Sequence, residues 1–286
     1  GTAMLTAHAE RIGREIGVNG VWGNLGVALA ALATGGLTQY FSWRVAFFVP
    51  GAVAIAAGLA FLALVPDRPA PPKPAAARGA ALPRTTMLRI FLILAGVTAA
   101  SGLVFNATTI SLPKVLNERL LSLVSSPFGI SILVACVYSL GATAQLLVGR
   151  LLDRFPLRRV FIALAILQAP SLWFASDAGG WPMLAVSVVM MFSIFGQVTI
   201  NDAMVARYTS EAWRARAYAL RYLVSFGASA TAVPLIAYLH DRGGGFAAMF
   251  AVLAGFAILV LIGAALLPRQ AAPANPTAKA SLQPAE

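Results

Sequence analysis

The sequence predicts an all-α, polytopic membrane protein with eight membrane-spanning helices, and three observations lead to this prediction. Hydrophobic residues make up 59% of the 286 residues and charged residues only 11%, whereas soluble domains carry about a quarter charged residues. The apolar residues are collected in runs of about twenty, the length that a helix needs to cross the hydrocarbon core of a bilayer. The basic residues lie mainly between these runs.

The first predicted span covers residues 18–41 and the second covers residues 45–65. A very short turn at Ser42, Trp43 and Arg44 joins them. The first span is rich in Gly and Ala at three- and four-residue spacing, which allows helix backbones to approach closely in lipid. We therefore expect this span to pack tightly against another helix.

A proline-rich, polar segment at residues 66–87 divides the chain, because it can neither cross lipid nor form a stable helix. It is predicted to be a cytoplasmic linker between residues 1–65, which hold an inner loop and two spans, and a six-helix bundle at residues 88–268. Residues 269–286 are rich in Ala and Pro and are predicted to be a disordered cytoplasmic tail. The six spans of the bundle are expected at residues 88–112, 128–148, 160–175, 182–206, 215–239 and 246–267.

The distribution of the 21 Lys and Arg residues predicts the orientation. Sixteen fall in segments on one face, Arg221 falls inside a span, and only Arg44, Lys114, Arg119 and Arg242 fall on the other face. Cytoplasmic loops carry such an excess of basic residues. We expect a multi-pass protein of the cell membrane, inner or plasma, with both termini in the cytoplasm. The net charge of +11 is then explained by the basic residues of the cytoplasmic segments, and no binding of nucleic acid is expected.

Residue types that support enzymatic or metal chemistry are sparse. Cys136 is the only cysteine, and the two histidines, His8 and His240, fall at opposite faces of the membrane. A disulfide, a metal site and a bound cofactor are therefore not expected. A membrane-embedded enzyme would need a nucleophile with a base, or clustered ligands at one depth, and the sequence offers neither. We expect no enzymatic activity.

A basic island at residues 149–160 separates two of the long apolar runs. It begins with Gly149, continues with Asp153 and Arg154, and ends with a pair of arginines of which Arg158 is the first. This spacing resembles the loop signature of the major facilitator superfamily of transporters, which lies between the second and third helices of each six-helix half. The resemblance implies the fold of that family.

Two positions depart from the signature, because Pro156 and Leu157 stand where it usually has a Gly and a basic residue. The turn at Trp43 and Arg44 resembles the family's short corner between its fifth and sixth helices. The island follows the second span after the linker, so the visible spans correspond to helices 5–12 of the family. About the first four helices are then expected to be absent from this sequence, and a true eight-helix protein is the alternative.

The resemblance implies a secondary active transporter that moves a small molecule by alternating access, as a monomer and coupled to protons. Uptake and efflux both remain open. The alternatives are a membrane receptor or scaffold without transport activity, and an inactive, truncated carrier.

In this family the second half lines the substrate cavity with its seventh, eighth, tenth and eleventh helices. Uncharged amides and hydroxyls in the matching spans are candidates for substrate contact, but such groups also join helices to one another. Helix packing is therefore the alternative for each candidate. The candidates are Asn106, Thr109, Tyr138, Gln197, Asn201 and Tyr222, with Asn24 in the first span.

Asp202 and Arg221 are the charged residues that fall within spans, where charges are rare and usually functional. They lie nine and ten residues from the loop centre at Glu211, so two antiparallel helices bring them to nearly the same depth. We predict an ion pair with a structural or gating role. Arg154 or Arg158 is a possible competitor for Asp202, and a proton-carrying Asp202 is the alternative role.

The resemblance also implies gating roles in the island, for Gly149, Asp153, Arg154 and Arg158. The family's loop aspartate faces the start of a helix in the opposite half, where free N–H groups and the helix dipole favour an anion. We therefore expect Asp153 near the inner end of the first span, around residues 17–20.

Overall fold

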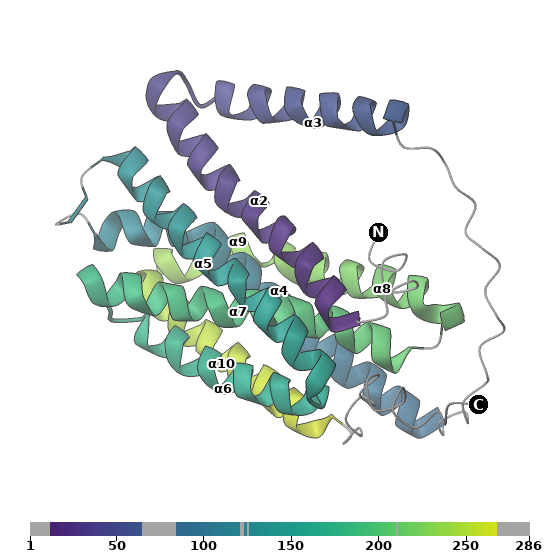
Figure 1. The fold of residues 1–286 in the computed structure, drawn as a ribbon. Coiled ribbons are helices and arrows are strands. Elements are labelled where there is room, and N and C mark those ends of the chain that lie inside the picture. Colours follow the sequence, from purple (N-terminus) through teal and green to yellow (C-terminus); the bar gives the residue numbers. More distant parts are fainter. Residues whose placement is uncertain (1–11, 65–83, 121–122, 125, 210, 268–286) are drawn as a thin grey trace, which may run out of the picture.

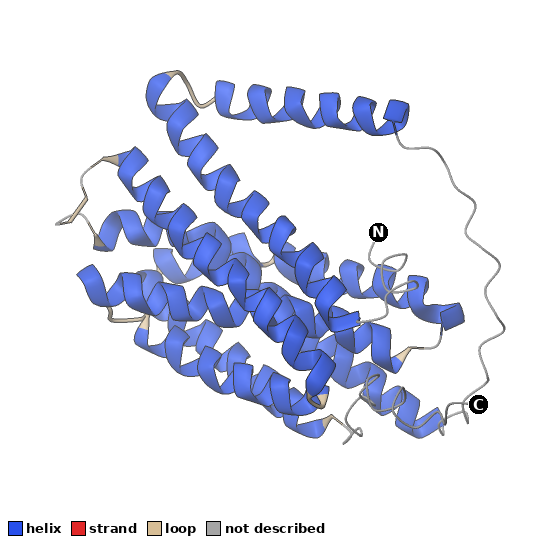
Figure 2. Ribbon diagram, viewed as in Figure 1, coloured by secondary structure: helices blue, strands red, loops and turns tan. Residues whose placement is uncertain are grey.

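The computed structural model describes residues 12–64, 84–120, 123–124, 126–209 and 211–267. These residues form helices and connecting turns, with no strand among them (Figure 2). Eight helical segments in this part of the chain are long and apolar enough to cross a membrane. The predicted all-α, eight-span architecture is confirmed.

The first two spans are α2 (Ile12–Tyr40) and α3 (Val45–Leu64). The first begins about six residues before the predicted start at residue 18. The second stands away from the bundle (Figure 1), and its side chains from Phe47 onward are all exposed. Its one extensive contact among the described elements is with α2. An apolar helix with so little contact to the rest of the chain is suited to a lipid environment or to further helices.

The remaining helices form one bundle in which α7 packs against α5, α6 and α4. Its core contains large side chains that are fully buried, such as Tyr138, Phe195 and Phe250. The bundle helices are α4 (Arg84–Arg119), α5 (Pro127–Arg154), α6 (Leu157–Phe174), α7 (Gly180–Tyr208), α8 (Glu211–Ala230), α9 (Ala232–Asp241) and α10 (Gly245–Leu266).

Helix α4 is longer than the span expected at residues 88–112. It starts at Arg84, inside the predicted linker, and runs through Pro113 to Arg119. The guanidinium of Arg119 donates hydrogen bonds to the carbonyls of Ser176 (2.8 Å) and Ala178 (3.0 Å), which fixes this end of the helix against the turn between α6 and α7. Most of the predicted linker, residues 66–83, and the predicted tail lie outside the described residues.

The span expected at residues 215–239 consists of two helices, α8 and α9, separated at Thr231. Pro234 follows three residues later and has no N–H for the carbonyl of Ala230, four residues before it. The interruption allows the two halves of this span to pack differently. Helix α9 packs on α10, and helix α8 packs mainly on α4.

Helices α2 and α5 make the most extensive contact in the structure, which we call the α2–α5 seam. A Cβ atom added to Gly17 would lie 2.5 Å from the carbonyl oxygen of Gln145, and one added to Gly149 would lie 3.3 Å from the Cα of Gly17. The two backbones therefore touch directly, as the small residues of the first span predict. The seam runs from the end with Gly149, here called the basic end, to the far end with Phe128.

Candidate functional site

Two predicted amide residues join neighbouring helices of the bundle. The Nδ2 of Asn106 in α4 donates to the Oγ of Ser229 in α8 (2.6 Å) and to the carbonyl of Gly102 (3.0 Å). The Nδ2 of Asn201 in α7 donates to the Oγ of Ser101 in α4 (2.9 Å). Each amide therefore takes part in helix packing. Any donor or acceptor of the amide that remains unpaired is still able to bind water or a solute.

Tyr138 is bonded to the backbone beside Pro113. Its hydroxyl donates to the carbonyl of Thr109 (2.7 Å), four residues before the proline. Proline has no N–H to donate to that carbonyl, so the tyrosine takes the place of the missing helix bond. The ring of Tyr138 lies 5.9 Å from the ring of Phe195, which lies 5.7 Å from that of Phe105. Tyr138 is thereby held at its hydroxyl and at its ring in the core of the bundle.

Gln197 is paired with a residue that the sequence analysis did not select. The Nε2 of Gln168 in α6 donates to the Oε1 of Gln197 in α7 (3.0 Å). Both side chains are buried, with 1% and 3% of their surface exposed. The only sequence signal for Gln168 is an amide within an apolar run, which by itself does not reveal its partner.

Several polar atoms in this region have no hydrogen-bond partner in the described part of the chain. They include the Oγ1 of Thr109, the Oε1 of Gln168, the Nε2 of Gln197 and the Oδ1 of Asn201. A buried polar atom without a partner costs about 1 to 3 kcal/mol. Water or a bound solute would remove this cost. We call these four residues, with Asn106 and Tyr138, the polar band; it offers both donors and acceptors and no charge.

Replacing one glutamine of the buried pair is expected to destabilise the protein more than replacing both. Gln168→Leu or Gln197→Leu leaves the other amide unpaired and should lower the free energy of unfolding by about 1 to 3 kcal/mol. The double leucine variant should recover much of this loss, because neither amide then remains. Unfolding of the purified variants in bicelles would measure the coupling.

The exposed variant Thr143→Val serves as a control for the glutamine series, because its hydroxyl is bonded only within its own helix. Additive losses in the double variant would mean that the two amides do not stabilise each other.

Two further candidates lie away from the polar band. Asn24 is buried, and its Nδ2 has no partner in the described residues. Gly20 lies one turn before Asn24 in α2, and the amide of Gln145 packs against it in the α2–α5 seam. The Oε1 of Gln145 also has no partner in the described residues. Gln145 was not selected from the sequence. Tyr222 is 40% exposed and its ring is stacked on that of Phe226 at 6.1 Å, so it lies on the outer face of α8.

The two charged residues within the spans form an ion pair. The Nη1 of Arg221 in α8 donates to the Oδ1 of Asp202 in α7, and these side chains are 10% and 12% exposed. The hydroxyl of Tyr218 donates to the backbone carbonyl of Asp202 (2.9 Å), one turn before Arg221. The antiparallel register that the loop length implies therefore brings the two charges together.

The arginines of the basic island have other positions. Arg154 is exposed at the end of α5. The Nη2 of Arg158 donates to the carbonyl of Ala265 in the last turn of α10 (2.7 Å). The competition of these arginines for Asp202 that the sequence allowed is not seen, because Asp202 is paired with Arg221.

The carboxylate of Asp153 caps the start of α2 across the α2–α5 seam. Its Oδ1 accepts a hydrogen bond from the N–H of Gly13 (2.9 Å), and its Oδ2 accepts one from the N–H of Arg14 (3.0 Å). The first N–H groups of a helix have no partner within it, and the helix dipole favours an anion there. The contact lies about one turn before residues 17–20. Asp153 therefore lies at the predicted inner end of the first span, and the residue numbers differ because α2 begins earlier than predicted.

The sequence model of the Major Facilitator Superfamily matches residues 1–143 and, in a second and overlapping match, residues 94–285. No curated protein matches the chain.

Proposed function

Because this chain belongs to the major facilitator superfamily, a family of transporters, we propose that it moves a small molecule by alternating access as a secondary active transporter. Protons are the proposed coupling ion, and the basic end of the bundle is proposed to face the cytoplasm, in line with the bias of basic residues. The observation that carries this proposal is the bond of Asp153 across the α2–α5 seam.

The α2–α5 seam has a separate polar contact at each end. At the basic end, Asp153 accepts from the N–H groups of Gly13 and Arg14 in the first turn of α2. At the far end, the Oε1 of Gln39 accepts from the N–H of Phe128 (3.1 Å), and the ring of Tyr40 lies 6.2 Å from that of Phe128. Two independent contacts allow one end to open while the other stays closed, which is what alternating access requires.

The polar band is proposed to contact the substrate. All of its side chains except that of Thr109 are held in place by bonds between helices. Four of the six residues still have an unpaired donor or acceptor. Amides and hydroxyls of this kind match an uncharged or zwitterionic polar solute better than an apolar one, because an apolar solute would leave them unpaired. Asn24 and Tyr222 lie outside this group.

Asp202 is proposed to stabilise the closed basic end through its ion pair with Arg221. It is the one buried carboxylate among the described residues, so it is also the place where proton coupling is to be tested.

The proposal is tested by measuring distances across both ends of the α2–α5 seam. Spin labels at Val18 and Arg150 report on the basic end, and labels at Thr38 and Ile132 report on the far end. Cys136 is exposed and unpaired and is replaced by serine in all samples. Double electron–electron resonance on the chain in lipid nanodiscs should show two distance populations for each pair.

Asp153→Asn should shift the first label pair towards the longer distance and the second towards the shorter one. Weakening the two charge-assisted bonds by about 1 to 2 kcal/mol would change the ratio of the populations by roughly five- to thirtyfold. Asp177→Asn, at an exposed acid in a turn at the far end of the bundle, is the control. One unchanging distance in all variants would refute alternating motion at this seam.

A further inference from the structure

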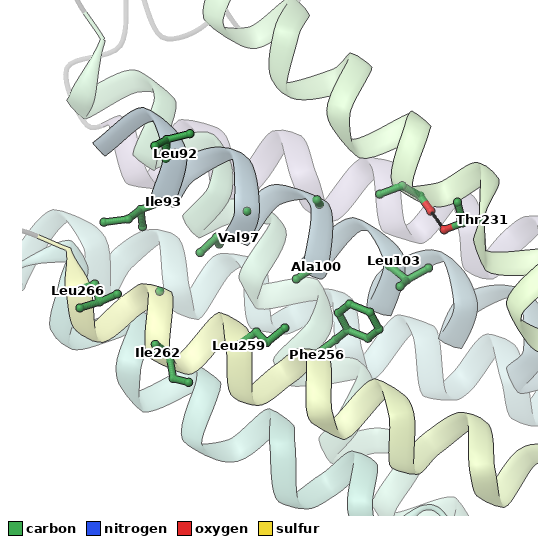
Figure 3. A pocket seen from close by; sticks show the side chains of 14 residues that line it. Leu92, Ile93, Val97, Ala100, Leu103, Thr231, Phe256, Leu259, Ile262 and Leu266 are labelled. Carbon is green, nitrogen blue, oxygen red and sulfur yellow. Dashed lines mark hydrogen bonds between the residues drawn. The ribbon is translucent and has the colours of Figure 1, made fainter. Parts of the chain in front are cut away.

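An apolar groove of about 490 Å³ lies between α4 and α10 and extends to the interruption between α8 and α9. Figure 3 shows side chains of α4 and α10 along its length, with Thr231 at one end. The hydroxyl of Thr231 donates to the carbonyl of Ala228, so the only polar side chain of the lining is already paired. Apart from the lone pairs of that hydroxyl, the side chains of the groove offer no polar partner to water, so the groove is suited to an apolar occupant.

The groove exists because α8 diverges from α10. Beyond Thr231, α9 packs on α10, but towards the basic end α8 packs on α4 instead. Small residues of α4, such as Gly96 and Ala100, line the bottom of the groove between α8 and α10. A Cβ atom added to Gly96 would meet no atom within 4 Å.

The dimensions of the groove match one hydrocarbon chain. It extends along α4 from Leu92 to Leu103, which at about 1.5 Å per residue is roughly 16 Å. One leaflet of the hydrocarbon core is about 15 Å thick, half of roughly 30 Å. An extended chain that lies along the groove therefore covers the same depth as the acyl chains of one leaflet.

The groove opens at the level where lipid headgroups lie. Leu92 and Leu266 border it at the basic end, and Leu266 is in the last turn of α10. The guanidinium of Arg158 donates to the carbonyl of Ala265 in the same turn. A cation therefore lies at the same depth as the mouth of the groove, which is the depth expected for a lipid phosphate.

We propose that the groove binds one acyl chain of a phospholipid from the leaflet at the basic end. The phosphate lies at the level of Arg158, and the chain reaches towards Thr231. Burial against the small residues of α4 distinguishes this lipid from those that merely surround the protein, because its chain contacts three helices at once.

The test uses a phosphatidylglycerol with a photoreactive diazirine in the middle of one acyl chain. The full chain is reconstituted in vesicles that contain this lipid, irradiated and mapped by mass spectrometry. Labelling is expected to concentrate on groove residues such as Ala99, Leu259 and Ile262, several-fold above that on the exposed helix α3. Equal labelling of the groove and α3 would overturn the proposal.

Gly96→Phe should fill the groove without a backbone clash and reduce the labelling of these residues to the level of α3. Gly255→Phe is the matched control, because Gly255 is exposed on α10, lies outside the groove and has no atom within 4 Å of an added Cβ. Ala99→Leu is a second filling variant, in case Gly96→Phe does not fold. Undiminished labelling in a folded filling variant would contradict the proposal.

Discussion

Gly149→Leu is expected to force α2 away from α5. The glycine faces the backbone of Gly13 and Gly17, and backbone atoms of a helix cannot move aside as a flexible side chain can. Forcing a larger side chain into a packed interface typically costs about 1 to 3 kcal/mol, and more where the backbone must shift. Since α3 contacts the described remainder mainly through α2, both helices should lose their fixed position. The spin-label pair at Thr38 and Ile132 should show a broad distance distribution in place of a defined one.

Gly23→Leu provides the matched control for this experiment. Gly23 is also in α2, but an added Cβ there has no atom within 4 Å. The change in helix propensity is the same for the two substitutions, so only the contact differs. If Gly149→Leu and Gly23→Leu gave the same distance distribution, the close contact of the two backbones would not stabilise the seam.

Asp202→Asn and Arg221→Gln are each expected to lower the amount of folded protein in the membrane strongly. Removing one partner of a buried ion pair leaves the other charge uncompensated, at a cost of about 3 to 5 kcal/mol. The exchange of the two residues, Asp202→Arg with Arg221→Asp, should restore part of the loss because the opposite charges again face each other. Membrane abundance and thermal unfolding of the purified variants measure both effects.

The same variants distinguish a structural role from proton transfer. A structural Asp202 predicts that Asp202→Asn folds poorly whatever its transport properties. A proton-carrying Asp202 predicts that Asp202→Asn folds normally, exchanges substrate and loses only accumulation driven by a pH gradient. Normal abundance together with that selective loss would show that the structural assignment is wrong.

The sequence predicted the membrane spans well, because hydrophobicity over about twenty residues is a local property. Helix ends were less predictable. The end of α4 was expected before Pro113, but the hydroxyl of Tyr138 replaces the backbone bond that the proline removes. The break at Thr231 was missed because the apolar run continues across it. Both outcomes depend on contacts between helices, which hydrophobicity does not report.

For the same reason, the candidate site could be predicted only in part. Polar residues within apolar runs are visible in a sequence, so Asn106, Gln197 and Asn201 could be selected. Their partners depend on how each helix is rotated about its axis, and the low hydrophobic asymmetry of these helices leaves that rotation undetermined. Gln168 was missed because it lies in α6, which matches none of the cavity-lining helices that the resemblance implies. The pair of Asp202 and Arg221 was predictable because loop length fixes the relative depth of two adjacent helices.

The glycines of the α2–α5 seam also bear on how fast the two helices can separate. Most contacts between helices interlock long side chains, and each of these must lose its rotamer freedom again whenever the contact forms. Glycine has no rotamers, so the surfaces at Gly13, Gly17 and Gly149 require no such reordering. The entropic cost of closing this contact therefore comes from the lost motion of the two helices as whole bodies, and not from side-chain rotamers at these glycines. A joint of this kind can open and close repeatedly with a small activation barrier and return to the same register.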